Sequence, residues 1–210
     1  MILLFLSFLL ACLALHHACH PISAQRFDSA FFMLLLLALI IAAFPTRQFL
    51  FERKLAVAVE KLTRRDGVSV TCQSLLGSFF HYNKLGYVQR GTHEIRLRPD
   101  ICKYLRRYMG DAHAVNKRAV KDYDGLMAVH VLTHEAMHIN QEYDEVKADC
   151  QAYQRNHKMA EYLGVAPRRA AQSAILIHRL RNQHHPYYSS HCEPGRALDE
   201  KLRGAVWHGP

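Results

Sequence analysis

The feature that most constrains this chain is the apolar run Ala30–Phe44, which contains no charged residue. It approaches the roughly 20 residues that span a bilayer, and it reaches that length if Phe27 and the cluster at 49–51 lie at the two interfaces. Such a run is too apolar for a helix on the surface of a water-soluble protein. We therefore expect a transmembrane anchor at about residues 29–45, followed by one water-soluble domain in residues 46–210.

A second apolar stretch, residues 1–15, precedes the anchor. It resembles the apolar part of a signal peptide, although no Lys or Arg precedes it and no clean small-residue cleavage site follows. Residues 1–20 are therefore either a signal peptide or a first transmembrane segment. Basic residues follow the anchor at Arg47, Arg53 and Lys54, and the positive-inside rule alone would place the soluble domain in the cytoplasm.

Cysteine usage favours the opposite side of the membrane. The soluble part contains four cysteines, Cys72, Cys102, Cys150 and Cys192, and none of them forms a Cys-x-x-Cys pair. An even number without zinc-knuckle spacing is typical of two disulfides in an oxidising compartment, with four buried thiols as the alternative. We therefore expect the soluble domain to be extracytoplasmic.

Hydrophobic periodicity and turn residues predict an α+β domain after the anchor. Strands are expected at Val68–Thr71, Gly86–Gln89 and His93–Leu97, and the last two form a hairpin around Gly91 within a small antiparallel sheet. Helices are expected at Phe49–Arg65, Ile101–Met109, Tyr123–Asn140, Asp144–Leu163 and Pro167–Asn182. Gly110 should end the second helix, Asn140 should adopt the left-handed conformation that closes the third, and the tail should be irregular and packed on the surface.

One motif carries chemistry: residues 134–138 have the pattern HExxH and lie within the third of these helices. Histidines four apart share one face of a helix, so that His134 and His138 can bring two imidazole nitrogens to a single Zn²⁺. Glu135 projects beside them, where its carboxylate can polarise a metal-bound water and take its proton. The motif therefore predicts a zinc site with two histidine ligands and Glu135 as the general base.

A catalytic zinc site needs a third protein ligand and an open position. Glu142 continues the stripe of the two histidines, but three residues along one straight helix cannot surround a metal. After a chain reversal at Asn140, Glu145 opens the next helix and Asp149 follows one turn later. We expect Glu145 as the ligand and Asp149 as a carboxylate that holds the far nitrogen of a ligand histidine, with Asp149 or Glu142 as the alternative ligands.

The competing interpretation of the motif is a histidine-rich surface helix. The chain has 15 histidines, and His130 continues the stripe four residues before His134, as a surface ladder would. The helix is nevertheless apolar around the motif, at Leu132, Ala136 and Met137, which favours a buried metal site.

The order of these motifs resembles the gluzincin metallopeptidases, whose signature is HExxH followed by ExxAD. Residues 134–138 match the first element and residues 145–149 match the second, with only six residues between them, which is short for a gluzincin. The resemblance implies Glu145 as the third ligand and Glu135 as the base. Over about residues 68–199 the chain is also similar to a group of small, membrane-anchored bacterial HExxH proteins. The shared features are the Cys72 region, Gly86-Tyr87-Val88, the Ile95 strand with Cys102, the metal motifs through Asp149-Cys150, and Cys192-x-Pro194-Gly195.

The cysteine positions fit this resemblance. Cys72 follows the first strand and Cys102 follows the hairpin, so that one bridge would tie the sheet to the next helix. Cys150 and Cys192 would then pin the tail across the metal-bearing helices. These are two pairings among the three connectivities that four cysteines allow.

A peptidase also needs an edge strand for an extended substrate and a donor for the developing oxyanion. The hairpin supplies such a strand. Tyr187, Tyr188 and His191 in the tail are candidate donors, but surface packing explains them better, and we leave them out of the catalytic set. A basic patch that could bind acidic peptide or lipid headgroups, or simply be a solvated face, consists of Arg96, Arg98, Arg106 and Arg107.

The sequence thus predicts an α+β, minimal zincin-like domain on a membrane anchor, hydrolysing peptide bonds of a peptide or protein substrate with a Zn²⁺-activated water. The alternative is a membrane-tethered binding or scaffold protein whose metal is structural or absent, which a fourth ligand such as Asp149 or Glu142 would favour. A cytoplasmic nucleic-acid-associated protein would suit the net charge of +9, all of which belongs to residues 46–210. No nucleic-acid motif is present, so we expect no such partner. The sequence does not determine the oligomeric state.

Overall fold

The computed structural model describes residues 7–13, 29–74, 84–89, 91–113, 123–181, 187 and 189–207. The chain divides into two compact units, Met1–Phe51 and Glu52–Pro210. Of the N-terminal segment expected at residues 1–20, residues 7–13 are helical, and the remainder lies outside the described residues. The hydroxyl of Ser7 donates a hydrogen bond to the carbonyl of Ala38 within the first unit, at 2.9 Å.

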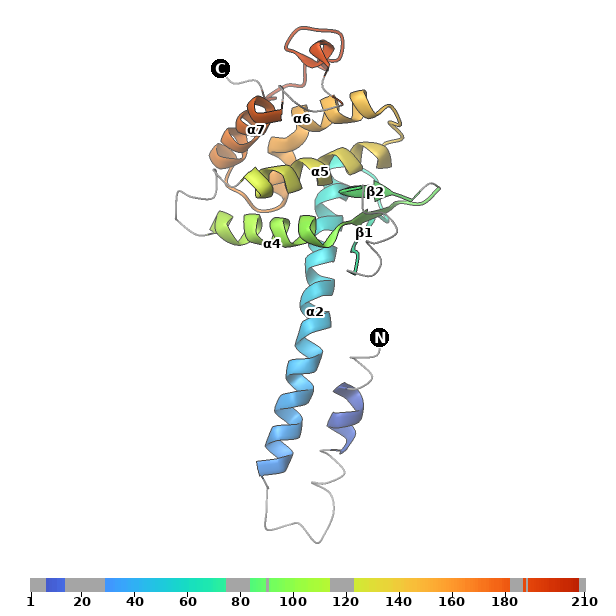
Figure 1. Cartoon of the computed structure of the whole chain (residues 1–210), viewed down its shortest axis with the longest axis vertical. Coiled ribbons are helices and arrows are strands. Elements are labelled where there is room, and N and C mark those ends of the chain that lie inside the picture. Colours follow the sequence, from blue (N-terminus) through green and yellow to red (C-terminus); the bar gives the residue numbers. More distant parts are fainter. Residues whose placement is uncertain are drawn as a thin grey trace. The chain divides into compact units, whose positions relative to one another are not determined.

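The first long element is helix α2, Ser29–Thr63 (Figure 1). The expected anchor and the helix expected at Phe49–Arg65 are one continuous helix, with Pro45 inside it. A proline removes one backbone N–H and strains the preceding turn, but the Thr46 hydroxyl donates to the Ala42 carbonyl at 2.8 Å beside it. The helix nevertheless continues through Pro45 to Thr63.

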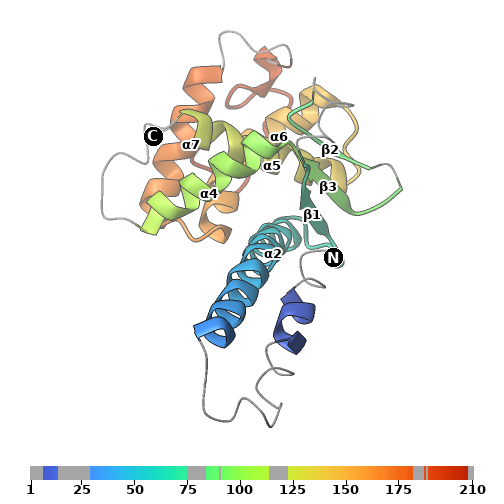
Figure 2. The same cartoon turned by 60° about the horizontal axis from the view of Figure 1, so that its bottom comes forward.

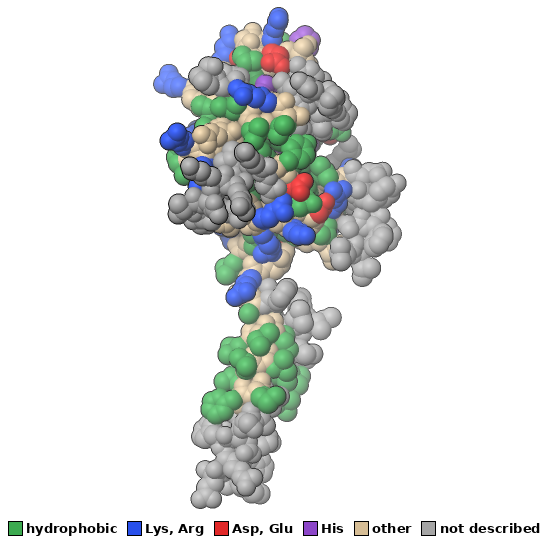
Figure 3. Space-filling model, turned by 60° about the vertical axis from the view of Figure 1, so that its left-hand side comes forward, with side chains coloured by type: hydrophobic (Ala, Val, Ile, Leu, Met, Phe, Trp, Pro, Cys, Tyr) green, Lys and Arg blue, Asp and Glu red, His purple; other side chains and the backbone are tan. Residues whose placement is uncertain are grey.

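The two halves of α2 differ in what they expose. Side chains such as Phe32, Met33 and Leu36 are exposed, and apolar atoms cover this part of the helix in Figure 3. Among the described residues, one helical stretch, Leu35–Thr63, is long and apolar enough to cross a membrane by length and composition. Residues 52–63 belong to the second unit, where Leu55 and Val59 are fully buried.

A three-stranded sheet has the order β1-β3-β2. Its strands are β1 (Ser69–Cys72), β2 (Gly86–Val88) and β3 (Glu94–Leu97). The β2–β3 hairpin is antiparallel, as predicted, and Gly91 in its turn has a φ of 76°. The prediction of an antiparallel sheet is wrong for β1, which pairs with β3 in parallel, because the long connection between these two strands allows a crossover.

Four helices accompany the sheet in Figures 1 and 2: α4 (Pro99–His113), α5 (Tyr123–Ile139), α6 (Glu145–Tyr162) and α7 (Pro167–Arg181). The predicted end of α4 at Gly110 is wrong. A glycine inside a helix lowers its stability by only about 1 kcal/mol relative to alanine. The burial of Ile101, Leu105 and Tyr108 stabilises α4 enough for the helix to continue past Gly110. The ends of the three later helices agree with the sequence to within a residue, except that residue 182 lies outside the described residues.

Helix α5 is the central element of the second unit. It packs against α4, α6, α7 and the strand β2. Twelve of its 17 residues are buried, among them Leu126, Val129 and Leu132. A helix that is covered on most sides in this way needs an apolar sequence around its whole circumference, and its polar side chains require specific partners.

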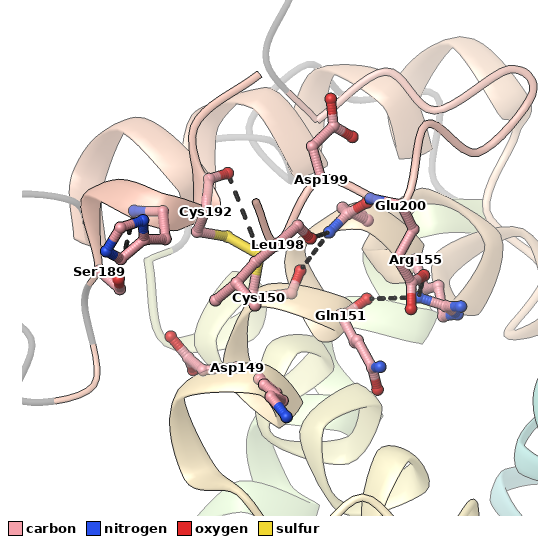
Figure 4. Close-up of a disulfide and its surroundings, with 12 residues drawn as sticks. Asp149, Cys150, Gln151, Arg155, Ser189, Cys192, Leu198, Asp199 and Glu200 are labelled. Atoms are coloured by element: carbon pink, nitrogen blue, oxygen red, sulfur yellow. Dashed lines mark hydrogen bonds and ion pairs between the residues drawn. A yellow bond between two sulfur atoms is a disulfide. The ribbon is translucent and has the colours of Figure 1, made fainter. Parts of the chain in front are cut away.

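The two disulfides are Cys72–Cys102 and Cys150–Cys192, which are the two favoured pairings. The second joins α6 to the 3₁₀ helix η4 (Ser190–Cys192), as Figure 4 shows. Trp207 is fully buried in a cluster with Cys150, Tyr153 and Cys192. The tail is irregular, as predicted, but it contributes to the core through this buried tryptophan.

The Gln154 side chain fastens the same tail to α6. Its amide nitrogen donates to the Leu198 carbonyl at 2.9 Å, and its amide oxygen accepts from the backbone N–H of Glu200 at 2.9 Å (Figure 4 shows both tail residues). Arg155 forms an ion pair with Glu200. The segment around η4 is therefore held at several points beside the residues that carry the candidate site.

Candidate metal centre

The turn between α5 and α6 determines where the site forms. After α5 ends, Gln141 adopts a φ of 68°, so that Gln141, and not Asn140, takes the left-handed conformation. The backbone N–H of Glu142 donates to the Met137 carbonyl at 3.2 Å, which closes the helix end. Asp144 caps α6 by accepting from the backbone N–H of Lys147 at 3.0 Å. The chain reverses within these few residues, and Glu145 begins α6 next to the histidines of α5.

Three ligand atoms converge at this reversal. The Nε2 atoms of His134 and His138 lie 3.1 Å apart. The Oε2 atom of Glu145 lies 3.0 Å from His134 Nε2 and 3.6 Å from His138 Nε2. These three side chains form the one group among the described residues that could hold a metal ion.

The separations fit one small cation. Ligand atoms at the usual zinc distances of about 2.0–2.1 Å lie about 3.3 Å apart at the corners of a tetrahedron. The three observed separations scatter around this value. The Glu145 side chain is 49% exposed, whereas the two imidazoles are 12% exposed, so that the group is open to solvent on the carboxylate side. A fourth, non-protein ligand would approach from this exposed side.

The His138 ring is oriented by the turn. Its Nδ1 donates to the backbone carbonyl of Glu142 at 2.6 Å, which leaves the lone pair of Nε2 for a metal. The Glu142 carboxylate accepts from the backbone N–H of Asp144 at 3.0 Å and is not part of the cluster. Of the three acidic residues considered as third ligand, the structure brings Glu145 to the histidines.

Asp149 lies behind the cluster. Its Oδ1 is 3.7 Å from His134 Nδ1, which is the far nitrogen of that ligand, and 2.7 Å from His130 Nε2. Asp149 is therefore near the Nδ1 atom of His134, but its hydrogen bond goes to His130, and its role beside a metal ligand stays a prediction. Cys150, the next residue, leaves α6 in another direction and forms its disulfide (Figure 4).

The interpretation of His130 as part of a surface ladder is wrong, because this residue is fully buried. Its second ring nitrogen, Nδ1, lies 3.0 Å from Nδ2 of Asn156. Sequence reasoning did not predict these contacts of His130 with Asp149 and Asn156. The available signals were the spacing of His130 from the motif on an apolar helix, and the spacing of seven residues between Asp149 and Asn156, which puts them on one face of α6.

Glu135 is the most perturbed carboxyl near the cluster. It is 5% exposed, and its Oε2 has no hydrogen-bond partner among the described residues. Burial is the main cause that raises the pKa of Glu135 to about 8; the charge of Glu145 acts in the same direction and Lys84 in the opposite one. A Cβ atom on Gly86 would lie 3.0 Å from Glu135 Cγ, so this glycine lets β2 approach the carboxyl closely.

The environment also shifts the pKa of His134. Burial lowers the pKa of His134, the neighbouring His138 lowers it further, and Asp149 and Glu145 act in the opposite direction. A neutral imidazole is the form that binds a metal. The imidazoles of His134 and His138 and the exposed carboxylate of Glu145 are thus groups that could bind a cation.

The tail contributes one further side chain. The Tyr187 ring stacks on the His134 ring, with centroids 6.3 Å apart and planes 15° from parallel. His191 lies on η4 and is exposed, and Tyr188 lies outside the described residues. In the expected basic patch, Arg96 pairs with Glu94, Arg98 with Asp100 and Arg107 with Asp124, which favours the solvated-face interpretation.

No protein-family model, curated protein or solved structure matches this chain. Its own residues therefore carry the functional argument.

Proposed function

We propose that this chain is a membrane-anchored, zinc-dependent metallopeptidase with a zincin-like domain of the gluzincin type. The supporting observation is the convergence of His134, His138 and Glu145 within 3.0–3.6 Å of one another. Two imidazoles and a carboxylate are a ligand set that zinc takes in catalytic sites, where the fourth position stays open. The exposed Glu145 side of the cluster leaves that position accessible.

Zinc at this position would supply a Lewis acid that polarises a water molecule and the scissile carbonyl. Glu135 accepts the proton of the attacking water at its carboxylate and returns it to the leaving amine. Its pKa of about 8 describes the metal-free protein. A divalent cation nearby favours the charged carboxylate and lowers that pKa, so the base becomes available when the metal is present.

An extended substrate would bind along β2. Among the described strands, β2 pairs only with β3, so its other edge has no strand partner. Gly86 on this strand is adjacent to Glu135, which brings the edge next to the base. A peptide that added a strand there would present its backbone to the cluster.

The proposed location is the extracytoplasmic face of a membrane. The exposed apolar half of α2 would form the anchor. The two disulfides support an oxidising compartment for the second unit. The basic residues after the anchor favour the opposite orientation, but a disulfide in a reducing compartment would not persist, and we give the disulfides more weight.

The non-catalytic alternative would need a closed metal site. The Glu142 carboxylate bonds to the turn, and Asp149 faces the far side of His134, so neither supplies a fourth ligand in the described part of the chain. This arrangement favours the catalytic hypothesis.

A Glu135→Gln variant tests the proposal. The full chain purified in detergent should bind one zinc per chain, as measured by elemental analysis, and should cleave members of a peptide library. The variant should keep its zinc and lose at least 99% of the cleavage rate, because a missing general base costs about 10²–10⁴-fold. Cleavage at the wild-type rate by Glu135→Gln would contradict the mechanism, and the absence of zinc from the wild type would contradict the proposal as a whole.

A further inference from the structure

We propose that His130 is a positioning residue for the metal centre: its buried ring, held by Asn156, fixes the Asp149 carboxylate that faces the far nitrogen of His134. This inference rests on the metal-binding half of the proposed function. It does not depend on peptide hydrolysis, so that its test uses metal binding as the readout.

The three residues form a chain of contacts between two helices. His130 lies on α5, one turn before His134, whereas Asp149 and Asn156 lie two turns apart on α6. All three are at most 3% exposed. Each buried polar group of this kind costs free energy unless it has a partner, so the mutual hydrogen bonds determine how the side chains are oriented.

The distances also specify where the protons lie. The Asn156 amide nitrogen is a donor and lies 3.0 Å from His130 Nδ1, which must therefore accept. The proton of the neutral His130 ring then sits on Nε2, which donates to Asp149 Oδ1 at 2.7 Å. Both ring nitrogens are occupied, and the Tyr153 ring lies against His130 with centroids 4.5 Å apart. The ring thus has one orientation, and it presents one donor to Asp149.

Asp149 transmits this orientation to the cluster. The same oxygen that accepts from His130 lies 3.7 Å from His134 Nδ1. A carboxylate at the far nitrogen of a ligand histidine favours a proton on that nitrogen and leaves the lone pair of Nε2 for the metal. Without His130 the Asp149 side chain would lose a buried donor that helps to set its rotamer. The consequence is a weaker and less uniform metal site.

The test compares three variants in the full chain purified in detergent. His130→Phe keeps a ring but removes both hydrogen bonds. His130→Gln restores an N–H that can reach Asp149. His178→Phe is the matched control, since His178 is also buried and also packs on Tyr153, at 5.3 Å between ring centroids, but it lies on α7 and not on the helices that carry the cluster. The readouts are the zinc dissociation constant, measured by competition with a chromophoric chelator, and the visible absorption spectrum of the Co²⁺-substituted protein.

His130→Phe should weaken zinc binding about tenfold, the lower end of the range for outer partners of a metal site, and should change the Co²⁺ spectrum. His130→Gln should recover most of the zinc affinity. His178→Phe should have a zinc dissociation constant within about twofold of the wild type, because a substitution away from the zinc ligands acts independently of them. A double variant, His130→Phe with Asp149→Asn, should bind zinc no more weakly than Asp149→Asn alone, because His130 acts through Asp149. If His130→Phe does not fold, Asn156→Leu replaces it and should also weaken binding and change the spectrum.

The inference is overturned if His130→Phe, or Asn156→Leu in its place, binds zinc as the wild type does, or if His178→Phe weakens binding equally. It is also overturned if the effects of His130→Phe and Asp149→Asn are additive. A wild-type protein that binds zinc but cleaves no peptide would contradict only the proposed catalysis, and the predicted differences in zinc affinity would still support the inference. A wild type that binds no zinc would overturn both.

Discussion

Three histidines on one face of α5, His130, His134 and His138, lie in two different environments. His134 and His138 keep 12% of their side chains exposed and face the exposed carboxylate of Glu145. His130, one turn earlier, is 1% exposed and has a polar partner at each ring nitrogen. The residue type and the spacing are the same, so the difference comes from the residues that α6 places opposite each ring. A partly exposed end, where two ring nitrogens and a carboxylate oxygen converge, can bind a cation, whereas a buried ring with a partner at each nitrogen can only orient its neighbours.

The largest expected effect that separates the two ends is the loss of metal. His134→Ala or His138→Ala should each weaken zinc binding by more than about 100-fold, beyond the range expected for outer partners. His130→Phe should leave zinc bound at micromolar protein, with only a modest loss of affinity. Elemental analysis after gel filtration measures the zinc per chain. Equal zinc loss in all three variants would remove the distinction between ligands and positioning residues.

A second, smaller effect tests which carboxylate belongs to the open end. Glu145→Gln should weaken zinc binding by at least about tenfold, since an amide is a poorer ligand than a carboxylate. Glu142→Gln should change it by less than about twofold, because this side chain bonds to the Asp144 backbone N–H and an amide oxygen can accept the same hydrogen bond. Chelator competition measures both. The opposite ranking would make Glu142 the ligand.

Loss of the disulfide that fastens the tail should affect the packing around His130 and Asp149 more than the cluster of His134, His138 and Glu145. The Cys150–Cys192 disulfide spans 42 residues and starts beside Asp149. Replacing both cysteines with alanine should lower the free energy of unfolding by about 2–4 kcal/mol, as measured by denaturant titration. The zinc dissociation constant should change less than in Glu145→Gln, because the turn at residues 140–144 positions Glu145 independently of the disulfide. If the variant lost more free energy of zinc binding than free energy of unfolding, the tail would be part of the metal site itself.

A further expected effect is a pH dependence of the free energy of unfolding of the metal-free protein. The pKa of Glu135 is about 8 in the folded state, against an ordinary value of 4.5. The folded protein therefore binds more protons than the unfolded chain between these values, and the Glu135 contribution to stability falls as the pH rises from 4.5 to about 8. Its slope is at most about 1.4 kcal/mol per pH unit. Urea titrations of wild type and Glu135→Gln across this range, without metal, should differ by that slope, and parallel curves would contradict the raised pKa.

Local sequence signals predicted much of the fold. Asp144 is a good N-cap, and Gly91 suits the turn of the β2–β3 hairpin, so these boundaries follow from short-range chemistry. The spacing of the motif, the chain reversal and the family resemblance together placed Glu145 beside His134. The predictions failed where packing overrides propensity, as at Gly110 within α4, and where pairing is long-range, as for β1 with β3.

The candidate site was predictable only at its open end. The HExxH pattern brings His134 and His138 together because one helix turn has a fixed length. The burial of His130 could not be read from the same stripe, since it depends on which face of α6 packs on α5 and on the Trp207 and Cys192 contacts that fasten the tail. A histidine has the same spacing whether its nitrogens meet water, a metal or a buried carboxylate.

The central claim is that His134, His138 and Glu145 hold a zinc ion with an open fourth position. Zinc K-edge X-ray absorption of the full chain loaded with one equivalent of zinc tests it most directly. The account predicts two imidazole nitrogens, one carboxylate oxygen and one solvent oxygen at about 2.0–2.1 Å, and a loss of this spectrum in His134→Ala. Sulfur ligands at about 2.3 Å, or a spectrum that is unchanged in His134→Ala, would contradict it.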